Sequence, residues 1–413
     1  MTRQRIRFRG NPQTEIKSQS LPVAFERKRE ELDLLVMLGP VLMTIAGFAA
    51  AEPGKVYARA RELCGELGDN TRLFPVLWGL WLSHAARVEL SRARDLADEV
   101  MSLAEELGDA AQRIEAHHAM WTTLWLRGEM TAARLHTESG TALYNPREHG
   151  SLASLYGGHD PGVCGCNHAA LAQWFLGHPD RALRTSRDAL ALAHELAHPS
   201  SLAWALIAAA IVDQLRGERG GAAAHAEAAI ALAAEHGFAQ WTAPGMVLRG
   251  WAKSDPATGA REVANMRQAI AAWGRQAFVT YHLGAIAQTC CELGCLDEAL
   301  EVVTEAFDLV ERTGERWYEA ELHRLGGELL LLRDSSPTSA AESSFRTAIE
   351  VARKQEAKSL ELRATTSLAR LLAKQNRRDE ARAMLAEIYN WFTEGFDTAD
   401  LKDAKSLLDE LSE

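Results

Sequence analysis

Residues 171–196 read LAQWFLGHPDRALRTSRDALALAHEL, and residues 211–236, forty positions later, read IVDQLRGERGGAAAHAEAAIALAAEH. Both stretches have a glycine at the same place, Gly177 and Gly217, and an alanine five residues after it. Glycine adopts positive φ at little cost, as the end of a helix requires. The small residue that follows lets a second helix pack closely on the first. Each stretch therefore predicts two helices joined by a tight turn.

The same unit recurs along the chain. A small residue or proline opens the second helix of each unit, at Pro53, Ala93, Ala133, Ala182, Ala222, Ala260, Ala299, Ala341 and Ala381. The turn before it is occupied, in the units where it is clearest, by Gly128, Gly177, Gly217, Asp255, Gly294 and Asn376. Because one hairpin cannot bury its apolar face alone, such units stack. The sequence predicts an all-α fold, an α-solenoid of about nine tetratricopeptide-like hairpins with a period of about 40 residues and a C-terminal helix near 398–411.

Composition and charge limit the class of protein. A chain of 413 residues suggests two or three domains, but the repeat predicts a single repeat domain over 31–413 behind a basic, flexible N-terminal arm over 1–30. Acidic residues number 56 against 45 basic ones, which argues against binding to a nucleic-acid backbone.

The cysteine content bears on the compartment. Six cysteines are too few for a disulfide scaffold. Because disulfide scaffolds are typical of secreted proteins, we expect a cytoplasmic protein.

One segment requires a membrane test. Residues 34–51 carry no charge over 18 positions, the lower limit for a spanning helix. Gly39 and Pro40 interrupt the segment, and its end resembles a turn. We therefore expect a buried first helix and no membrane contact.

Four segments resemble a known bacterial helical-repeat region: LDLLVMLGPVLMTIAGFAAAEPGKVYARARELC (32–64), LFPVLWGLW (73–81), LYGGHDPGV (155–163) and WFTEGFDTADLKDAKSLLDEL (391–411). That region is the C-terminal part of large predicted signalling ATPases, many of them fused to a class III adenylate or guanylate cyclase domain. It is also similar to the repeats of MalT-like transcription activators. The resemblance covers roughly residues 30–413.

In that family the nucleotide chemistry lies upstream of the repeats. No G-x-x-x-x-G-K-[ST] loop occurs here, so the resemblance implies no catalytic residue and no cofactor. It implies a non-enzymatic scaffold or sensor module, either excised from such a protein or encoded alone. The module would bind a protein segment or small effector and regulate an associated ATPase or cyclase in cis or in trans. An alternative is the effector domain of a MalT-like transcription regulator.

A concave groove is the expected binding surface. The tetratricopeptide register assigns its inner positions to Trp78, His118, Trp125, Trp174, Trp204, Arg249, Tyr281 and Arg370. Aromatic rings beside arginine are suited to holding a peptide, although longer helices could instead bury these rings. The 49-residue spacing between the third and fourth units predicts an inserted loop beside the groove, with His159 and Asp160.

Two patterns could hold a metal. His194-Glu195-x-x-His198 matches a zinc hydrolase motif, the alternative from a different functional class. However, Pro199 ends the helix that the motif needs. A second cluster comprises His159, Asp160, Cys164, Cys166 and His168, but its C-x-C spacing is not that of a standard zinc knuckle. We expect packed thiols, a capping Asp160 and no metal at either place.

The absence of the nucleotide loop generates a first prediction. The isolated chain is expected neither to hydrolyse nor to cyclise ATP or GTP, because no backbone cradle with a lysine holds the phosphates. Phosphate release and cyclic-nucleotide formation measure this. Turnover that co-purifies with the chain and disappears on a point substitution would refute it.

Overall fold

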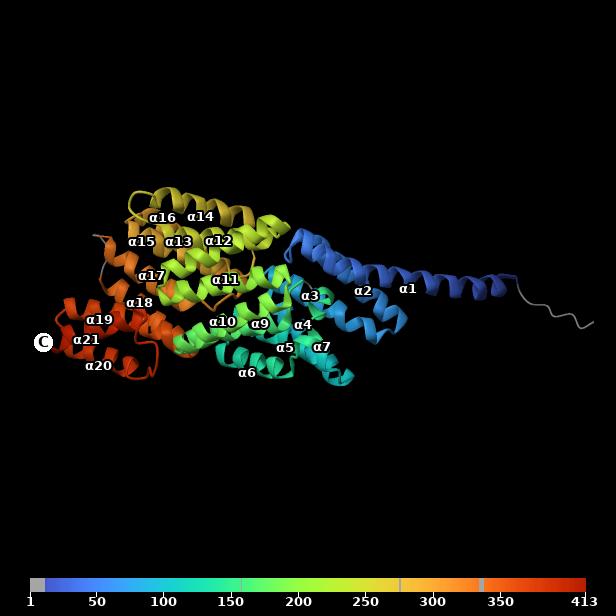
Figure 1. Ribbon diagram of the computed structural model, residues 1–413, viewed down its shortest axis with the longest axis horizontal. Helices are drawn as coiled ribbons and strands as arrows, with labels where there is room; N and C mark the ends of the chain where they lie inside the picture. Colours follow the sequence, from blue (N-terminus) through green and yellow to red (C-terminus); the bar gives the residue numbers. More distant parts are fainter. Residues whose placement is uncertain (1–11, 157, 275, 334–337) are drawn as a thin grey trace, which may run out of the picture.

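The computed structural model describes residues 12–156, 158–274, 276–333 and 338–413, and within them the chain is helical with no strand (Figure 1). Nine antiparallel hairpins follow one another: α1 (Pro12–Ala46) with α2 (Ala51–Leu67), α3 (Asn70–Ala86) with α4 (Leu90–Leu107), α5 (Ala110–Leu126) with α6 (Met130–Leu143), α9 (Pro161–Phe175) with α10 (Pro179–Leu196), α11 (Pro199–Arg216) with α12 (Arg219–His236), α13 (Ala239–Lys253) with α14 (Gly259–Trp273), α15 (Val279–Leu293) with α16 (Leu296–Thr313), α17 (Glu319–Leu332) with α18 (Thr338–Lys354), and α19 (Lys358–Lys374) with α20 (Arg378–Tyr389). The predicted α-solenoid is confirmed.

Three further helices complete the chain. The short helices α7 (Pro146–His149) and α8 (Leu152–Leu155) occupy the longer spacing between the third and fourth hairpins. The last helix, α21 (Ala399–Ser412), packs against α19 and α20 at the C-terminal end. Both features agree with the expected insertion and the expected terminal helix.

The turns within the hairpins use left-handed backbone at most of the predicted positions. Gly128 has φ +79° and Asn376 has φ +62°. Asp255 differs, because its φ is not positive; its side chain instead accepts hydrogen bonds from the Ala257 and Thr258 amides at 2.8 and 2.9 Å. The hairpin turn at this place is thus closed by a side chain.

The solenoid winds back on itself after five hairpins. The C-terminal ends of the first helices in hairpins two, three and four accept hydrogen bonds from the start of hairpins seven, eight and nine. These bonds join Ala277 N to Ala86 O (3.0 Å), Arg316 N to Leu126 O (2.9 Å) and Ser359 Oγ to Trp174 O (2.5 Å). The inner face of the superhelix is therefore covered by the chain's own later hairpins.

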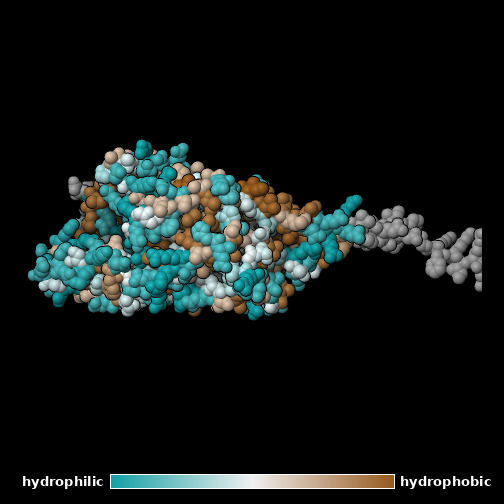
Figure 2. Space-filling view, in the orientation of Figure 1, coloured by the Kyte–Doolittle hydropathy of each residue, from teal (hydrophilic) through white to brown (hydrophobic). Residues whose placement is uncertain are grey.

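The N-terminal hairpin departs from two expectations. Helix α1 begins at Pro12, so the expected boundary at residue 30 falls inside a helix; residues 1–11 of the expected arm lie outside the described residues. The first helix is also not buried throughout, since Leu34 and Ile45 are 64% and 71% exposed. Among the described residues the first hairpin has a neighbouring hairpin on one side only, and one face of α1 is uncovered. Figure 2 shows hydrophobic side chains gathered where α1 meets the rest of the molecule.

The uncovered face of α1 is not part of a membrane span. Of the helices in the described ranges, none combines the length and the apolar character that crossing a bilayer requires.

A buried carboxylate lies where the superhelix closes. Glu315 accepts hydrogen bonds from the Phe278 amide (2.6 Å) and from Trp317 Nε1 (3.0 Å), and it is 1% exposed. Burial raises the pKa of Glu315 from 4.5 to about 7, an effect that the hydrogen bonds only partly oppose. The side chain thus connects the starts of α15 and α17.

The Glu315 pKa predicts how stability changes with pH. The folded chain holds a proton that the unfolded chain releases above pH 4.5, so this stabilisation is present below pH 4.5 and is lost as pH rises through about 7. Relative to Glu315→Gln, which keeps an acceptor, the unfolding free energy of the natural chain should fall by up to about 3 kcal/mol over this window. Urea unfolding of both proteins at a series of pH values measures this. A difference that does not vary with pH would contradict it.

Candidate functional site

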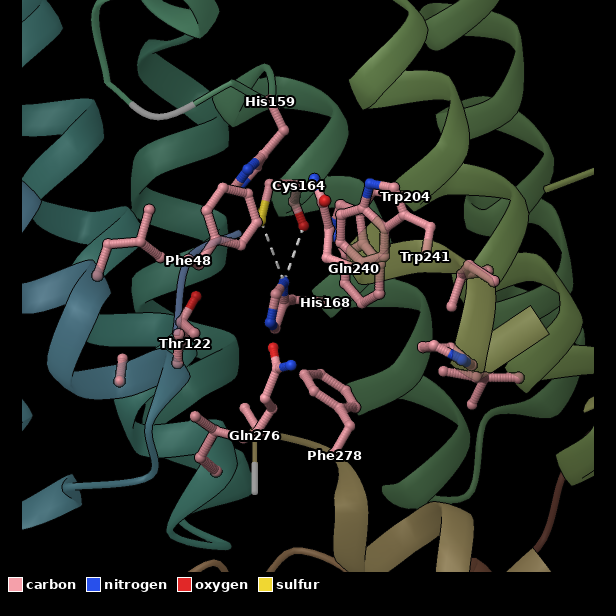
Figure 3. A pocket seen from close by; sticks show the side chains of 18 of the residues that line it. Phe48, Thr122, His159, Cys164, His168, Trp204, Gln240, Trp241, Gln276 and Phe278 are labelled. Carbon is pink, nitrogen blue, oxygen red and sulfur yellow. Dashed lines mark hydrogen bonds between the residues drawn. The ribbon is translucent and has the colours of Figure 1, made fainter. Parts of the chain in front are cut away.

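A cavity of about 110 Å³ lies inside the superhelix, and its walls come from each of the first seven hairpins (Figure 3). Its aromatic lining consists of Phe48, Trp81, Trp204, Trp241, Trp273 and Phe278, together with four histidines, His118, His159, His168 and His282. Phe48 lies in the turn between α1 and α2, whereas Phe278 immediately precedes α15. The cavity therefore exists only because distant hairpins meet.

Aromatic contacts hold these walls together. Trp204 of α11 stacks on Trp241 of α13, with ring centroids 5.3 Å apart and planes inclined by 16°. Phe48 meets the edge of Trp241 at 6.3 Å, and Phe278 meets Trp204 at 5.7 Å. Such edge and stacked contacts fix the ring positions, so the cavity has a defined shape.

Unpaired polar atoms gather around the same cavity. Six side-chain atoms of its lining are buried and have no hydrogen-bond partner among the described residues: Thr122 Oγ1, His159 Nδ1, His168 Nε2, Trp241 Nε1, Trp273 Nε1 and His282 Nε2. A buried polar atom without a partner costs stability, and most proteins retain only a few. Their concentration at one apolar cavity is typical of a binding site, where a ligand supplies the missing partners.

One wall of the cavity carries a histidine–cysteine cluster, which we define as His118, His159 and Cys164. Their ligand atoms all lie within 4.8 Å of one another, and the Nε2 atoms of the two histidines are 3.3 Å apart. His118 Nδ1 lies 3.0 Å from Glu115 Oε2, which is also buried. The cluster thus combines two imidazoles and a thiol with a carboxylate behind them.

Burial determines the protonation of the cluster. It lowers the pKa of His159 to about 3 and holds the pKa of His118 well below its usual range. It raises the pKa of the Cys164 thiol and that of Glu115. Both imidazoles are therefore neutral near pH 7, and each has a nitrogen lone pair available.

The remaining members of the inserted-loop pattern have other roles. Asp160 caps α9, because its Oδ1 accepts a hydrogen bond from the Val163 amide at 2.9 Å, as the sequence suggested. His168 donates from Nδ1 to the Cys164 carbonyl at 3.0 Å, and its ring faces the cavity. Cys166 is half-buried and does not belong to the cluster.

The expected aromatic track along an open groove is wrong. Trp78, Trp125 and Trp174 are at most 1% exposed, and Trp204 is 5% exposed. Later parts of the chain cover two of them: Trp125 contacts Trp317 of the α16–α17 turn with centroids 5.1 Å apart, and Arg363 of α19 lies over Trp174. Of the four rings only Trp204 lines the cavity.

The other expected groove residues are also separated from one another. Tyr281 is buried and donates a hydrogen bond to Gln214 Oε1 at 2.9 Å, whereas Arg249 is half-buried. Arg370 is exposed and pairs with Asp403 beside a different, polar cleft. His118 and His159 are the two expected site residues, apart from Trp204, that do line the cavity.

The zinc hydrolase motif is interrupted. Helix α10 ends at Leu196, Ala197 is left-handed with φ +51°, and His198 caps α11. His194 and His198 therefore do not lie one turn apart on a single helix, which the motif requires. The hydrolase alternative loses its geometric basis.

Several cavity residues were not found from the sequence. Phe48 lies in the turn of the first hairpin, and Gln276 and Phe278 lie in the connection between the sixth and seventh hairpins, where helix register makes no prediction; Trp273 is the last residue of α14. Trp241 lies two turns before Arg249 on α13 and shares its face, so the helical register could have found it.

Comparisons with known proteins support the fold. No protein family model matches the chain. An uncharacterized protein of Rhizobium meliloti (strain 1021) is 26% identical over 349 residues, which cover 83% of this chain and 34% of that protein. The chain thus spans about a third of the length of this relative.

Two solved structures share the architecture. A Rap protein complexed with competence and sporulation factor has a TM-score of 0.58 at 13% identity, and the match covers 92% of this chain and 99% of that chain. The apo form of the quorum sensor NprR from B. thuringiensis has a TM-score of 0.51 at 14% identity, covering 88% and 98%. These likenesses show a tetratricopeptide-like helical-repeat fold.

The buried tryptophans generate a stability prediction. Trp125→Ala should lower the free energy of unfolding by about 3–5 kcal/mol, because the ring is enclosed by Trp317 and Phe175. Trp391→Ala, the same change at a ring that is 40% exposed, should cost about 1 kcal/mol or less. Denaturant unfolding compares the two variants. Similar losses in both would show that Trp125 is not a core residue.

Proposed function

We propose that this chain is a sensor module that binds a protein segment or small effector through an apolar group inserted into the cavity. The observation that supports it is the coincidence of an aromatic cavity with six buried, unpaired polar atoms. The apolar walls favour an apolar group, and the polar atoms would fix its orientation. No enzyme chemistry is needed for this role.

The cavity volume limits the size of the group that can bind inside it. A cavity of about 150 Å³ accepts benzene, so about 110 Å³ suits one aliphatic side chain or a small ring, and not a whole peptide. The effector would therefore insert a single anchor group, while its remainder contacts the surface around the mouth. The Rap protein bound to competence and sporulation factor and the quorum sensor NprR have the same kind of fold, which supports a sensor role.

The position of the cavity would allow ligand binding to change the shape of the whole solenoid. Phe48 of the first hairpin and Phe278 of the seventh lie on its walls. A ligand can shift the populations of two conformations only if it binds one of them more tightly. A ligand that contacts both turns of the superhelix would bind one winding of the solenoid more tightly than another and would therefore favour it. The resemblance of the repeats to those of signalling ATPases and cyclases supports such a domain, in cis or in trans, as the regulated partner.

The experiment uses benzene and pyrrole, two small rings, as probes of the cavity. At ten times its dissociation constant, a probe that binds only the folded chain should raise the unfolding free energy by about 1.4 kcal/mol. Ala277→Leu, which adds a larger side chain to the cavity wall, should abolish the effect. Ala191→Leu, the same change at an exposed position of α10, should leave it intact.

Thermal unfolding with and without each probe measures the result, and circular dichroism checks that both variants are folded. Stabilisation that is equal in Ala277→Leu and Ala191→Leu, or absent in the natural chain, would overturn the proposed binding site.

A further inference from the structure

We propose that His118, His159 and Cys164 bind a zinc ion, with the fourth coordination position open to the cavity. The three side chains come from α5, from the loop before α9 and from the first turn of α9, and all three line the cavity. This inference goes beyond effector binding, and its test does not depend on an effector.

The spacing of the ligand atoms fits a tetrahedral ion. Zinc bonds of about 2.05 Å to nitrogen and about 2.3 Å to sulfur imply a nitrogen–nitrogen separation of about 3.3 Å and a nitrogen–sulfur separation of about 3.6 Å. His118 Nε2 and His159 Nε2 are 3.3 Å apart. Cys164 Sγ lies within 4.8 Å of a ring nitrogen of each histidine, so these separations exceed the tetrahedral value by at most about 1.2 Å.

The carboxylate behind the cluster has the position that zinc sites use. Glu115 Oε2 is 3.0 Å from His118 Nδ1, so a proton on Nδ1 leaves Nε2 as the metal-binding atom. Histidine ligands commonly donate their second N–H to such a carboxylate, which fixes the ring and its tautomer. The structure thus supplies an outer-shell partner as well as three ligands.

Charge also balances in this site. A zinc ion carries two positive charges, and the Cys164 thiolate and the Glu115 carboxylate carry one negative charge each. Binding displaces the Cys164 thiol proton and one proton from the Glu115–His118 pair to solvent, and no electron is transferred. A buried site with no net charge avoids the large cost of an isolated buried ion.

The two imidazoles and the thiolate favour zinc over magnesium or calcium, which prefer oxygen ligands. Three protein ligands and one open position are also the arrangement of zinc sites that take an exogenous ligand. A group that enters the cavity would therefore be able to reach the ion.

This site differs from the one that the sequence pattern suggested. Cys166 and His168 are not needed, and His118 is supplied by another hairpin, 41 residues before His159 in the chain. The expectation of no metal in the inserted loop was based on spacing within that loop, which could not include His118.

The test is zinc and cobalt(II) binding to the full chain after chelator treatment. The natural chain should bind one zinc ion after equilibrium dialysis. His118→Ala and Cys164→Ser should each weaken binding by at least about 100-fold, and Glu115→Gln should weaken it by about 10- to 100-fold. Cobalt(II) should give the absorption of a tetrahedral site with a thiolate charge-transfer band, which Cys164→Ser removes.

Two matched controls isolate the site. Cys166→Ser changes a half-buried cysteine two residues away, and His194→Ala changes an exposed histidine of the interrupted hydrolase motif. Both should keep the zinc stoichiometry and affinity of the natural chain. Circular dichroism of every variant verifies folding, and the cobalt spectrum of the natural chain tests the ligand set even if a variant fails to fold.

Three results would overturn the proposal: no tight zinc binding by the natural chain, a cobalt spectrum without a thiolate band, or zinc retained at full affinity in folded Cys164→Ser. Zinc binding without any effect of benzene or pyrrole would instead refute the proposed effector cavity and leave the metal site standing.

Discussion

Successive turns of the superhelix contact each other, and these contacts hold the later hairpins over the inner face. A solenoid of helical hairpins has an open inner face, and this chain closes that face by hydrogen-bonding the end of one first helix to the start of the first helix five hairpins later. These bonds satisfy carbonyls at helix ends that would otherwise lack intrahelical partners. They also bring the aromatic side chains of distant hairpins into one core.

The interior that results is not uniformly filled. Around Trp125 and Trp317 the rings pack against each other and exclude solvent. Between Phe48 of the first hairpin and Phe278 at the start of the seventh, a cavity remains, and six buried polar atoms of its lining have no partner among the described residues. Because unpaired buried groups reduce stability, their presence is more readily explained by binding than by folding. The histidine–cysteine cluster lies on this wall and contributes one of the unpaired atoms, His159 Nδ1.

The two ends of the solenoid are covered to different extents. Helix α1 has one neighbouring hairpin, so Leu34 and Ile45 are exposed. At the other end α21 packs against the last hairpin and covers it, with Leu401 and Leu407 buried. Among the described residues, an additional helix covers the last hairpin, and none covers the exposed face of α1.

The hairpins, their approximate number and most of their turns could be predicted from the repeat, because these features depend on spacing between near neighbours. Gly128 and Asn376, for example, adopt the left-handed backbone that their position in the repeat predicts. The sequence also indicated the inserted loop and the cap formed by Asp160. Whether a ring of a first helix is exposed or buried depends on long-range packing, since Trp125 is covered by Trp317 from the distant α16–α17 turn. The tertiary structure also decided the membership of the cluster, where His118 joins His159 and Cys164 although no local pattern connects them. The physical reason is that the winding of a solenoid depends on small rotations between neighbouring hairpins, which accumulate over five units and are not encoded in any single repeat.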